Sequence, residues 1–270
     1  MSNLELDAEQ LDRYSRHVIM DEVGPGGQAA LLDSSVLVVG AGGLGTPVIQ
    51  YLAAAGVGRL GIADADVVER SNLQRQVIHG DADIDRPKVD SAAEFVAKLN
   101  PDITVERHEM RVTPETVTDL ISDYDVVVDA SDNFPTRFLL NDACVLADKP
   151  LSHGAVYRFE GQATTFTGGR PCYRCLFPEA PPEGSIPDCA TAGVLGVLPG
   201  TVGAIQATEV IKLLIGEGDT LDGRLLIYDA SNMTMETVPL KARPDCPVCG
   251  TRSLDSVSEA SYSESCAVPE

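Results

Sequence analysis

A glycine-rich turn between two apolar segments constrains the fold of this chain more than any other feature. The sequence GAGGLG at residues 40–45 directly follows the apolar run 36–39, and an acidic residue ends the next apolar run. Glycines let the backbone turn tightly and approach a nucleotide, and the start of the following helix offers unpaired N–H groups. This order is typical of nucleotide-binding α/β domains. The candidate nucleotide contacts in it are Gly42, Gly43, Gly45 and Asp64.

Apolar runs and helix-like segments alternate through the first half of the chain. Strands are predicted at 35–39, 59–63, 103–107 and 125–129, and helices at 44–55, 87–99, 114–122 and 135–147. After residue 151 the predicted elements are strands at 152–157 and 161–166, a helix at about 200–214, and strands at 223–229 and 235–240. The pattern predicts a Rossmann-like, doubly wound α/β fold with a mainly parallel sheet, extended by a C-terminal antiparallel portion.

The chain divides into a core and two terminal segments. Residues 1–34 predict an N-terminal helical segment, with an amphipathic stretch at 8–18 and a Gly/Pro-rich link at 24–27. Residues 35–250 form the predicted core domain. Residues 251–270 are rich in Ser and Glu without periodicity, which predicts a flexible tail.

The charge balance excludes several classes of partner. The formal net charge is -21, and only five lysines stand against 24 aspartates, which argues against nucleic acid or an anionic membrane as a partner. The lysine-poor, aspartate-rich balance indicates a halophilic protein that works in a high-salt cytoplasm. No run approaches the roughly 20 uncharged apolar residues of a membrane span, and the acidic N-terminus is unlike a secretory signal, so a cytoplasmic location is expected.

Two cations distinguish between interpretations of the nucleotide site. The glycine turn and Asp64 alone fit a dinucleotide-binding dehydrogenase about as well as any other nucleotide enzyme. Arg75, in the sequence SNLQRQ at 71–76, and Lys88 lie beyond the second predicted strand, and Asp132 follows a later one. Cations and a carboxylate suit phosphate and magnesium handling, whereas hydride transfer has little use for them. The set therefore favours nucleotidyl transfer, and the nearby Asp129 is interpreted as structural.

Four of the seven cysteines form two C-x-x-C pairs, Cys172 with Cys175 and Cys246 with Cys249. This spacing lets a tight turn present two thiolates to one tetrahedral Zn²⁺. Because the pairs are remote in sequence, the metal would join distant chain segments, which predicts a structural zinc site. A redox-active C-x-x-C motif is the alternative.

The remaining cysteines differ in their surroundings. Cys189 ends a Pro-rich loop and is the candidate nucleophile, with a small buried hydrophobe as the alternative interpretation. Cys144 lies in an apolar helical segment and is predicted to be core, and Cys266 receives no role. The four histidines are scattered without ligand spacing and receive no role either.

These motifs together resemble the ubiquitin-activating-like adenylyltransferases of the MoeB/ThiF family, and within it the archaeal UbaA branch. The resemblance covers residues 13–250. It rests on GAGGLG, SNLQRQ, Lys88, the pair Asp132 and Asn133, the two C-x-x-C pairs and the sequence DCATAG around Cys189.

The resemblance implies a role for each matching residue. Asp64 would hold the ribose of ATP, Asn72, Arg75 and Lys88 the phosphates, and Asp132 a magnesium ion. Arg16 matches an arginine that family members contribute to the ATP site of the opposite subunit, which implies a homodimer. Cys189 matches the family's catalytic cysteine. The same resemblance adds Ser71 and Asn133 to the nucleotide-binding set, which already contains Gly42, Gly43 and Gly45.

The implied activity is ATP- and Mg²⁺-dependent adenylation of the C-terminal glycine of a small ubiquitin-fold or sulfur-carrier protein that ends in Gly-Gly. The acyl adenylate then passes to a thiol or sulfur donor, for protein conjugation and for sulfur incorporation into molybdopterin and thiolated tRNA. A rhodanese domain, present in one branch, would need about a hundred residues after Gly250, so a separate sulfur-donor protein is expected. Alternatives are a tRNA-modifying cyclic-threonylcarbamoyladenosine synthase, which the acidic surface disfavours, and a non-catalytic zinc-organised binding scaffold.

Overall fold

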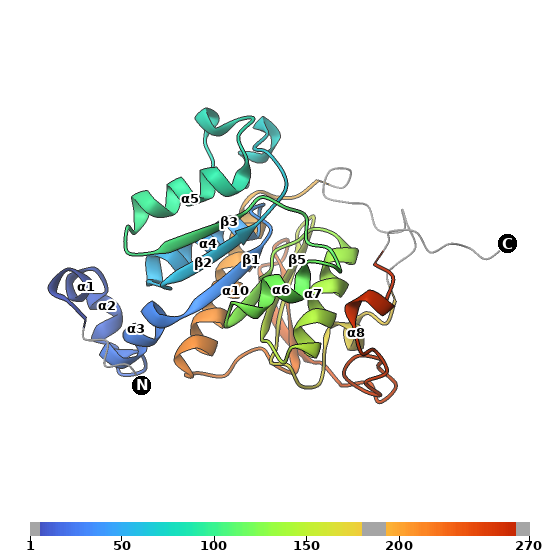
Figure 1. The fold of residues 1–270 in the computed structure, drawn as a ribbon. Helices are drawn as coiled ribbons and strands as arrows, with labels where there is room; N and C mark the ends of the chain where they lie inside the picture. The colour runs from blue at the N-terminus through green and yellow to red at the C-terminus, as the bar shows by residue number, and fades with distance from the viewer. Residues whose placement is uncertain (1–5, 180–192, 263–270) are drawn as a thin grey trace.

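The computed structural model describes residues 6–179 and 193–262 as one mixed sheet with helices on both faces (Figure 1). The strands are β1 (Ser35–Val39), β2 (Arg59–Ala63), β3 (Thr104–His108), β4 (Val126–Asp129), β5 (Leu151–Tyr157), β6 (Glu160–Phe166), β7 (Arg224–Asp229) and β8 (Thr234–Pro239). The helices are α1 (Ala8–Arg13), α2 (Ser15–Val18), α3 (Gly24–Asp33), α4 (Gly45–Ala55), α5 (Lys88–Leu99), α6 (Val117–Ser122), α7 (Phe134–Leu146), α8 (Tyr173–Leu176) and α10 (Val197–Ile215). Short 3₁₀ turns are η1 (Arg70–Asn72), η2 (Asp81–Asp83) and η3 (Val257–Glu259).

The strand order is β3-β2-β1-β4-β5-β6-β7-β8. Strands β1 to β5 pair in parallel, and β5 to β8 continue the sheet as antiparallel neighbours. The predicted fold class, a mainly parallel sheet with an antiparallel extension, is therefore confirmed. The chain moves outward in opposite directions from β1, to β2 on one side and β4 on the other. Open α/β sheets bind ligands outside the carboxyl ends of the strands at such a point.

Two apolar layers hold the helices on the sheet. One layer joins α4, α5 and α10 to one face, with Val38, Ile49 and Val202 fully buried. The other joins α6 and α7 to the opposite face, with Leu37, Val127 and Leu140 fully buried. Neighbouring residues of β1 thus point into different layers, as the two-residue period of a strand requires. The doubly wound arrangement follows from strands that are apolar on both faces.

Helix α10 is the one described helix that is long and apolar enough to cross a membrane by length and composition. It packs instead against α4 and against strands β4, β5 and β6. Glu209 lies inside this packing at 3 % exposure, and its carboxylate accepts hydrogen bonds from the Thr165 hydroxyl and the Leu221 N–H. A continuous apolar surface on this helix is explained by its position in the core.

The predicted Gly/Pro-rich link at 24–27 was wrong, because these residues begin α3. Pro25 lies in the first turn, where its missing N–H has no helical partner to lose. Gln28 and Leu31 are completely buried, and α3 packs against α2 and α10. Tertiary packing here outweighs the low helix propensity of Gly and Pro.

Two predicted helix starts also moved. Pro114 was expected in the first turn of its helix, but α6 begins at Val117, after a turn in which the Thr113 N–H donates to the Thr116 hydroxyl. Pro87 precedes α5 with extended backbone instead of opening the helix. The remaining strands and helices lie close to the ranges expected from the apolar pattern.

Residues 251–262, the described part of the segment for which the sequence predicts a flexible tail, pack against α7. Val257 is 4 % exposed and belongs to the same apolar layer as α6 and α7. The Tyr262 hydroxyl donates to the buried Asp142 carboxylate at 2.8 Å. This part of the chain therefore has specific contacts with the core.

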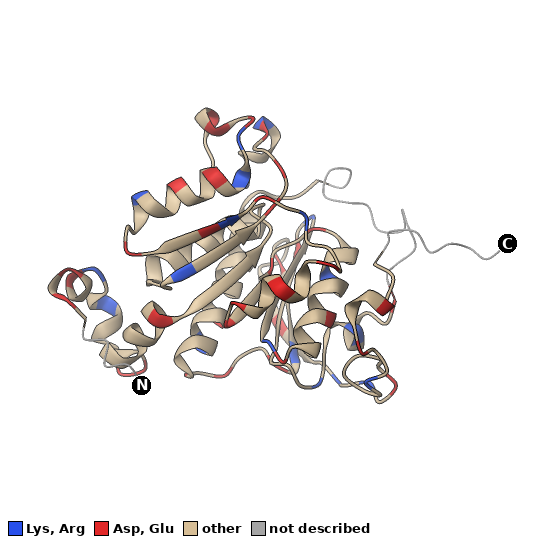
Figure 2. Cartoon of the chain, viewed as in Figure 1, with Lys and Arg blue, Asp and Glu red and all other residues tan. Residues whose placement is uncertain are grey.

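Acidic positions are spread over the helices and loops, with fewer basic positions between them (Figure 2). Several cations are paired with carboxylates, including Arg86 with Asp83 and Glu94. Negative charge therefore predominates in the described part of the chain, as the composition indicates.

Candidate active site

The glycine turn closes at the carboxyl end of β1. Gly40 has φ +102°, and a Cβ there would lie 2.7 Å from the carbonyl oxygen of Ala130. A Cβ at Gly45 would lie 1.8 Å from the carbonyl oxygen of Gly40, so the turn and the start of α4 touch directly. Side chains larger than hydrogen would force both segments apart. Gly45 is buried, and its role in the structure is to close the turn.

Side chains from two other segments hold the middle of this turn. The N–H of Ala41 donates to the Asp64 carboxylate at 2.7 Å, and the Asp66 N–H donates to the same carboxylate at 2.8 Å. The carbonyl of Ala41 accepts from Nε2 of His79 at 3.1 Å, and the other ring nitrogen contacts the Ser91 hydroxyl at 2.8 Å. Burial lowers the pKa of His79, which keeps the ring neutral. No role was predicted for His79, because the four histidines are scattered in the sequence without ligand spacing.

A cavity of about 290 Å³ opens over the turn, at the carboxyl ends of β1, β2 and β4. Eight of the residues predicted to bind nucleotide line it: Gly42, Gly43, Asp64, Asn72, Arg75, Lys88, Asp132 and Asn133. They come from five segments of the chain that the strand order brings to one edge of the sheet. The cavity is therefore at the position that the fold favours for a nucleotide.

Three cations line the cavity, and they differ in their partners. Lys88 is 6 % exposed, and its ammonium lies 2.9 Å from the Asp66 carboxylate. Arg75 donates to the carbonyl of Ser71 at 3.0 Å. Arg111, in the loop after β3, has no hydrogen-bond or ion-pair partner among the described residues. Arg111 was not predicted from the sequence, because no motif surrounds it.

The carboxylate expected to bind magnesium lies at the end of β4. Asp132 is exposed toward the cavity, and one of its oxygens lies 3.4 Å from the Asn133 amide nitrogen. Asn133 is the N-cap of α7, where its side chain accepts from the Thr136 N–H at 2.9 Å. An exposed carboxylate oxygen in the same cavity as Lys88 and Arg75 is a chemically suitable ligand for Mg²⁺ bound to phosphates.

Other predicted site residues lie away from the cavity lining. Ser71 is exposed and its hydroxyl donates to Glu69. Arg16 is exposed on α2 and does not line the cavity of its own chain. Cys189 lies outside the described residues. Cys144, predicted to be core, is 1 % exposed, and burial raises the pKa of its thiol.

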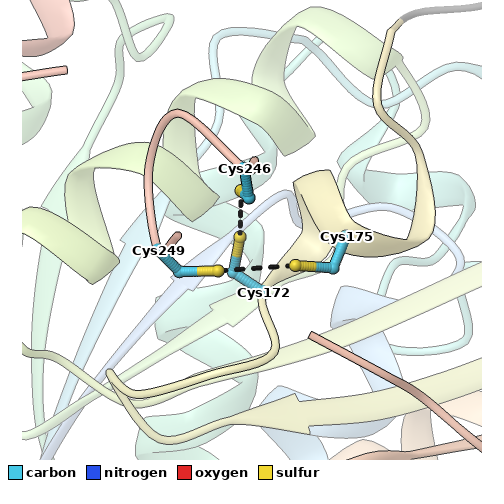
Figure 3. Close-up of side chains that lie close together, drawn as sticks. All are labelled: Cys172, Cys175, Cys246 and Cys249. Carbon is cyan, nitrogen blue, oxygen red and sulfur yellow. Dashed lines mark hydrogen bonds between the residues drawn. The ribbon is translucent and has the colours of Figure 1, made fainter. Parts of the chain in front are cut away.

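The two C-x-x-C pairs come together, as Figure 3 shows. All four sulfur atoms lie within 4.8 Å of one another, and all four residues are buried. Tetrahedral Zn²⁺ with bonds of about 2.3 Å places its sulfur ligands about 3.8 Å apart. The donor set therefore fits one tetrahedral metal ion. The backbone N–H of Arg243 also donates to the Cys175 sulfur at 3.3 Å, which would stabilise a thiolate.

The sulfur contacts distinguish a metal centre from a redox motif. The short contacts join the pairs to each other, with 3.7 Å between Cys172 and Cys246 and 3.4 Å between Cys175 and Cys249. A redox-active C-x-x-C would bring together the two sulfurs of one pair. Burial, together with the neighbouring thiols, raises the pKa of Cys172. A bound cation would reverse that shift by stabilising the thiolates.

Comparison with known proteins identifies the family. The model of the ThiF family matches residues 14–248. The chain belongs to the ThiF family. The resemblance deduced from the sequence motifs is thereby confirmed.

Close relatives share most of the chain. The SAMP-activating enzyme E1 of Haloferax volcanii is 66 % identical over 265 residues, which covers 98 % of each chain. The sulfur carrier protein adenylyltransferase of Thermus thermophilus is 51 % identical and covers 90 % of this chain and 92 % of its own. The adenylyltransferase and sulfurtransferase MOCS3 of Sus scrofa is 50 % identical over 92 % of this chain, which corresponds to 55 % of its own length. The predicted enzyme class, an adenylyltransferase, is confirmed by these relatives.

Solved structures show the same fold at lower identity. The crystal structure of E. coli MccB superposes with a TM-score of 0.79 at 23 % identity, covering 92 % of this chain and 74 % of MccB. The structure of E. coli MccB with ATP superposes with a TM-score of 0.74 at 22 % identity, covering 83 % of this chain and 69 % of the MccB chain. At this identity the likeness establishes the architecture alone.

Proposed function

We propose that this protein is a cytoplasmic enzyme that uses ATP to adenylate the C-terminal glycine of a small ubiquitin-like or sulfur-carrier protein. The observation that carries the proposal is the cavity at the carboxyl ends of the parallel strands. Arg75, Lys88 and Asp132 line this cavity together with the glycine turn. Relatives named as a SAMP-activating enzyme and a sulfur carrier protein adenylyltransferase support the same substrate class.

The geometry suggests how the first step proceeds. The carrier's carboxylate oxygen attacks the α-phosphorus of ATP, an oxygen–phosphorus bond forms, and the bond to the leaving pyrophosphate breaks. Lys88 and Arg75 neutralise the charge that develops on the phosphoryl oxygens, because fixed cations in a partly enclosed cavity need no rearrangement during the reaction. Asp64, whose carboxylate is already held by two N–H groups, faces the ribose. Asp132 would hold Mg²⁺, which supplies further positive charge to the phosphates.

The second step transfers the acyl group. In this proposal the thiolate of Cys189 attacks the carbonyl carbon of the acyl adenylate, a thioester forms and AMP leaves. Thiolates need little activation against such a leaving group. A separate sulfur-donor protein would then provide sulfur for molybdopterin and thiolated tRNA, and acceptor amines would give protein conjugates.

A homodimer is part of the proposal and is supported by an apolar surface beside α2. His17, Tyr51 and Ile211 line a second concavity of about 290 Å³ between α2, α4 and α10. Tyr51 in this concavity is 51 % exposed, and Ile19 and Met20, which directly follow α2, are 70 and 46 % exposed. Burial of this surface against a second copy would carry the exposed Arg16 toward another chain. Sedimentation at high salt tests it, and a monomer at assay concentrations would refute it.

The four-cysteine centre is proposed to hold one structural Zn²⁺. The support is the buried sulfur cluster and its fit to tetrahedral coordination. In this role the metal joins the segment after β6 to the segment after β8, and it takes no part in the transfer reaction.

The test of the proposed function is carrier-dependent ATP–pyrophosphate exchange, measured at high salt with candidate proteins that end in Gly-Gly. We expect exchange with at least one carrier and none with the same carrier lacking its terminal glycines. ATP binding at one site per chain without exchange for any carrier would support the scaffold alternative. Exchange that depends on tRNA alone would support the cyclic-threonylcarbamoyladenosine synthase.

A further inference from the structure

A carboxylate that the reaction does not use is completely buried beneath the cavity. Asp129, the last residue of β4, is 0 % exposed. One oxygen of its carboxylate lies 2.7 Å from Nδ1 of His153, whose side chain is 1 % exposed. Burial alone would raise the pKa of Asp129, but the hydrogen bond and charge of His153, with help from Arg137 and Ser131, more than offset it and lower the pKa. The carboxylate is therefore ionised.

The other carboxylate oxygen holds the loop that carries Asp132. It accepts from the N–H of Ser131 at 3.1 Å and from the Ser131 hydroxyl at 2.5 Å. The carbonyl of Ser131 accepts from Arg137 at 3.2 Å. Every polar group of Ser131 is thus engaged, and the residue is directly attached to Asp132.

The backbone on the other side of Asp129 is fixed as well. Its carbonyl accepts from the Gln206 amide at 2.8 Å, and the Ala130 N–H donates to the Val39 carbonyl at 2.9 Å. The loop between β4 and α7 therefore starts from a rigid point, and the remaining freedom at Asp132 depends on the Ser131 contacts with Asp129.

His153 has a defined position because it is packed from the far side. Its ring lies 4.7 Å from the ring of Tyr173, centroid to centroid. Tyr173 directly follows Cys172, one of the four clustered cysteines. The N–H of Tyr173 donates to the Asn141 side chain at 2.7 Å. The imidazole is held between this packing and the Asp129 carboxylate, so it can fix the carboxylate in one orientation.

We propose that Asp129 and His153 are positioning residues that orient Asp132 for magnesium binding, through the Ser131 backbone and hydroxyl. The inference rests on the proposed function, which assigns Mg²⁺ to Asp132. Outer groups that orient a metal ligand commonly change metal affinity by about 10- to 100-fold when they are removed. The pair takes no direct part in bond making, and its effect is expected on the magnesium dependence of ATP binding.

The experiment measures ATP binding to the full-length protein by calorimetry at high salt, while Mg²⁺ is varied. Asp129→Asn should raise the Mg²⁺ concentration for half-maximal ATP binding about tenfold. His153→Leu, which removes the donor to Asp129, should give a similar increase. His153→Asn keeps an N–H donor near the position of Nδ1, and its half-saturation should stay within about threefold of the parent protein.

A purely structural role predicts a different pattern. In that case the variants would lower the melting temperature and the fraction of competent protein, with an unchanged Mg²⁺ half-saturation, and the inference would be overturned. Ser131→Ala provides a milder variant should Asp129→Asn fail to fold, with an expected increase of about threefold or more because it removes only the hydroxyl contact.

The variant Asp132→Asn separates this inference from the proposed function. If it leaves the Mg²⁺ half-saturation unchanged, the magnesium assignment itself is wrong, whatever the other variants show. If it raises the half-saturation while Asp129→Asn and His153→Leu do not, only the positioning role of the buried pair is refuted. A rise in all three, with rescue in His153→Asn, supports both.

Discussion

The ammonium of Lys88 lies 2.9 Å from a carboxylate oxygen of Asp66, and the two side chains have opposite environments. Lys88 is buried, with 6 % of its surface exposed, whereas the Asp66 side chain is 62 % exposed. The backbone joins them as well, since the Lys88 N–H donates to the Asp66 carbonyl at 3.0 Å. Without nucleotide, Asp66 supplies the negative charge that a phosphate would supply to the same cation.

Asp66→Asn should therefore tighten ATP binding, because the nucleotide no longer competes with a carboxylate for Lys88. The ATP-free protein should lose about 1 kcal/mol of stability, which lowers the melting temperature by about 2–4 °C. Calorimetry and thermal melts with and without ATP measure both effects. Asp90→Asn, which removes an exposed charge paired with Arg107, is the matched control and should change neither. Weaker ATP binding in Asp66→Asn would contradict the competition.

Arg75→Ala should lower carrier-dependent exchange by at least about a hundredfold, the scale of losing one fixed electrostatic stabiliser. The control is Arg70→Ala, because Arg70 belongs to the same segment but its side chain is 77 % exposed and pairs with Asp81. Exchange in that variant should remain within about twofold of the parent protein. Comparable activity in the two variants would remove Arg75 from the site.

Elemental analysis of freshly purified protein should find one zinc per chain. Chelation, or Cys246→Ser, should lower the melting temperature, because the buried sulfurs that remain then lack the metal charge that holds them together. Cys144→Ser serves as the control, since this buried cysteine is absent from the cluster. Active protein that contains no metal would refute the assignment.

Cys189→Ser should separate the two chemical steps. Adenylation uses the nucleotide cavity, so pyrophosphate exchange and zinc content should be unchanged, while thiocarboxylate formation or conjugation should be lost. A serine hydroxyl is a far weaker nucleophile than a thiolate. Both steps are measured on one preparation, and a parallel loss, or no loss, would exclude Cys189 as the transfer thiol.

His79 should give folding stability a pH dependence. Burial lowers the pKa of His79 in the folded protein, whereas the unfolded chain takes up a proton near pH 6.5. The neutral ring is favoured by folding, so its contribution is complete above about pH 6.5 and falls as the pH decreases toward the folded-state pKa. His79→Gln keeps a donor for Ala41 and should reduce the slope by up to about 1.4 kcal/mol per pH unit below about pH 6.5. Equal slopes in denaturant titrations would refute this.

The sequence predicted most strands and helices because their apolar periods match the sheet and its two covered faces. It predicted a link at 24–27, where α3 begins, because glycine and proline have low helix propensity. Packing of Gln28 and Leu31 stabilises this helix. The cavity residues that belong to motifs were predicted, and eight of them meet in the structure.

The supporting residues of the site could not be predicted, because they act across the fold and belong to no motif. His79 contacts Ala41 from 38 positions away, and His153 contacts Asp129 from 24 positions away. A histidine with no neighbouring ligand residue has no distinctive pattern in a sequence. The contact between His153 and Asp129 follows from the sheet order, which places β5 beside β4.

The sulfur cluster has a consequence for the order in which this protein is made. Cys172 and Cys246 are 74 positions apart, and α10, β7 and β8 lie between them. On the ribosome the first thiol pair emerges as a half-site that can hold a metal with two ligands only. Complete coordination requires synthesis through Cys249, and every described strand of the sheet precedes this residue in the sequence. Complete coordination at the proposed metal centre would therefore follow the synthesis of every described strand of the sheet.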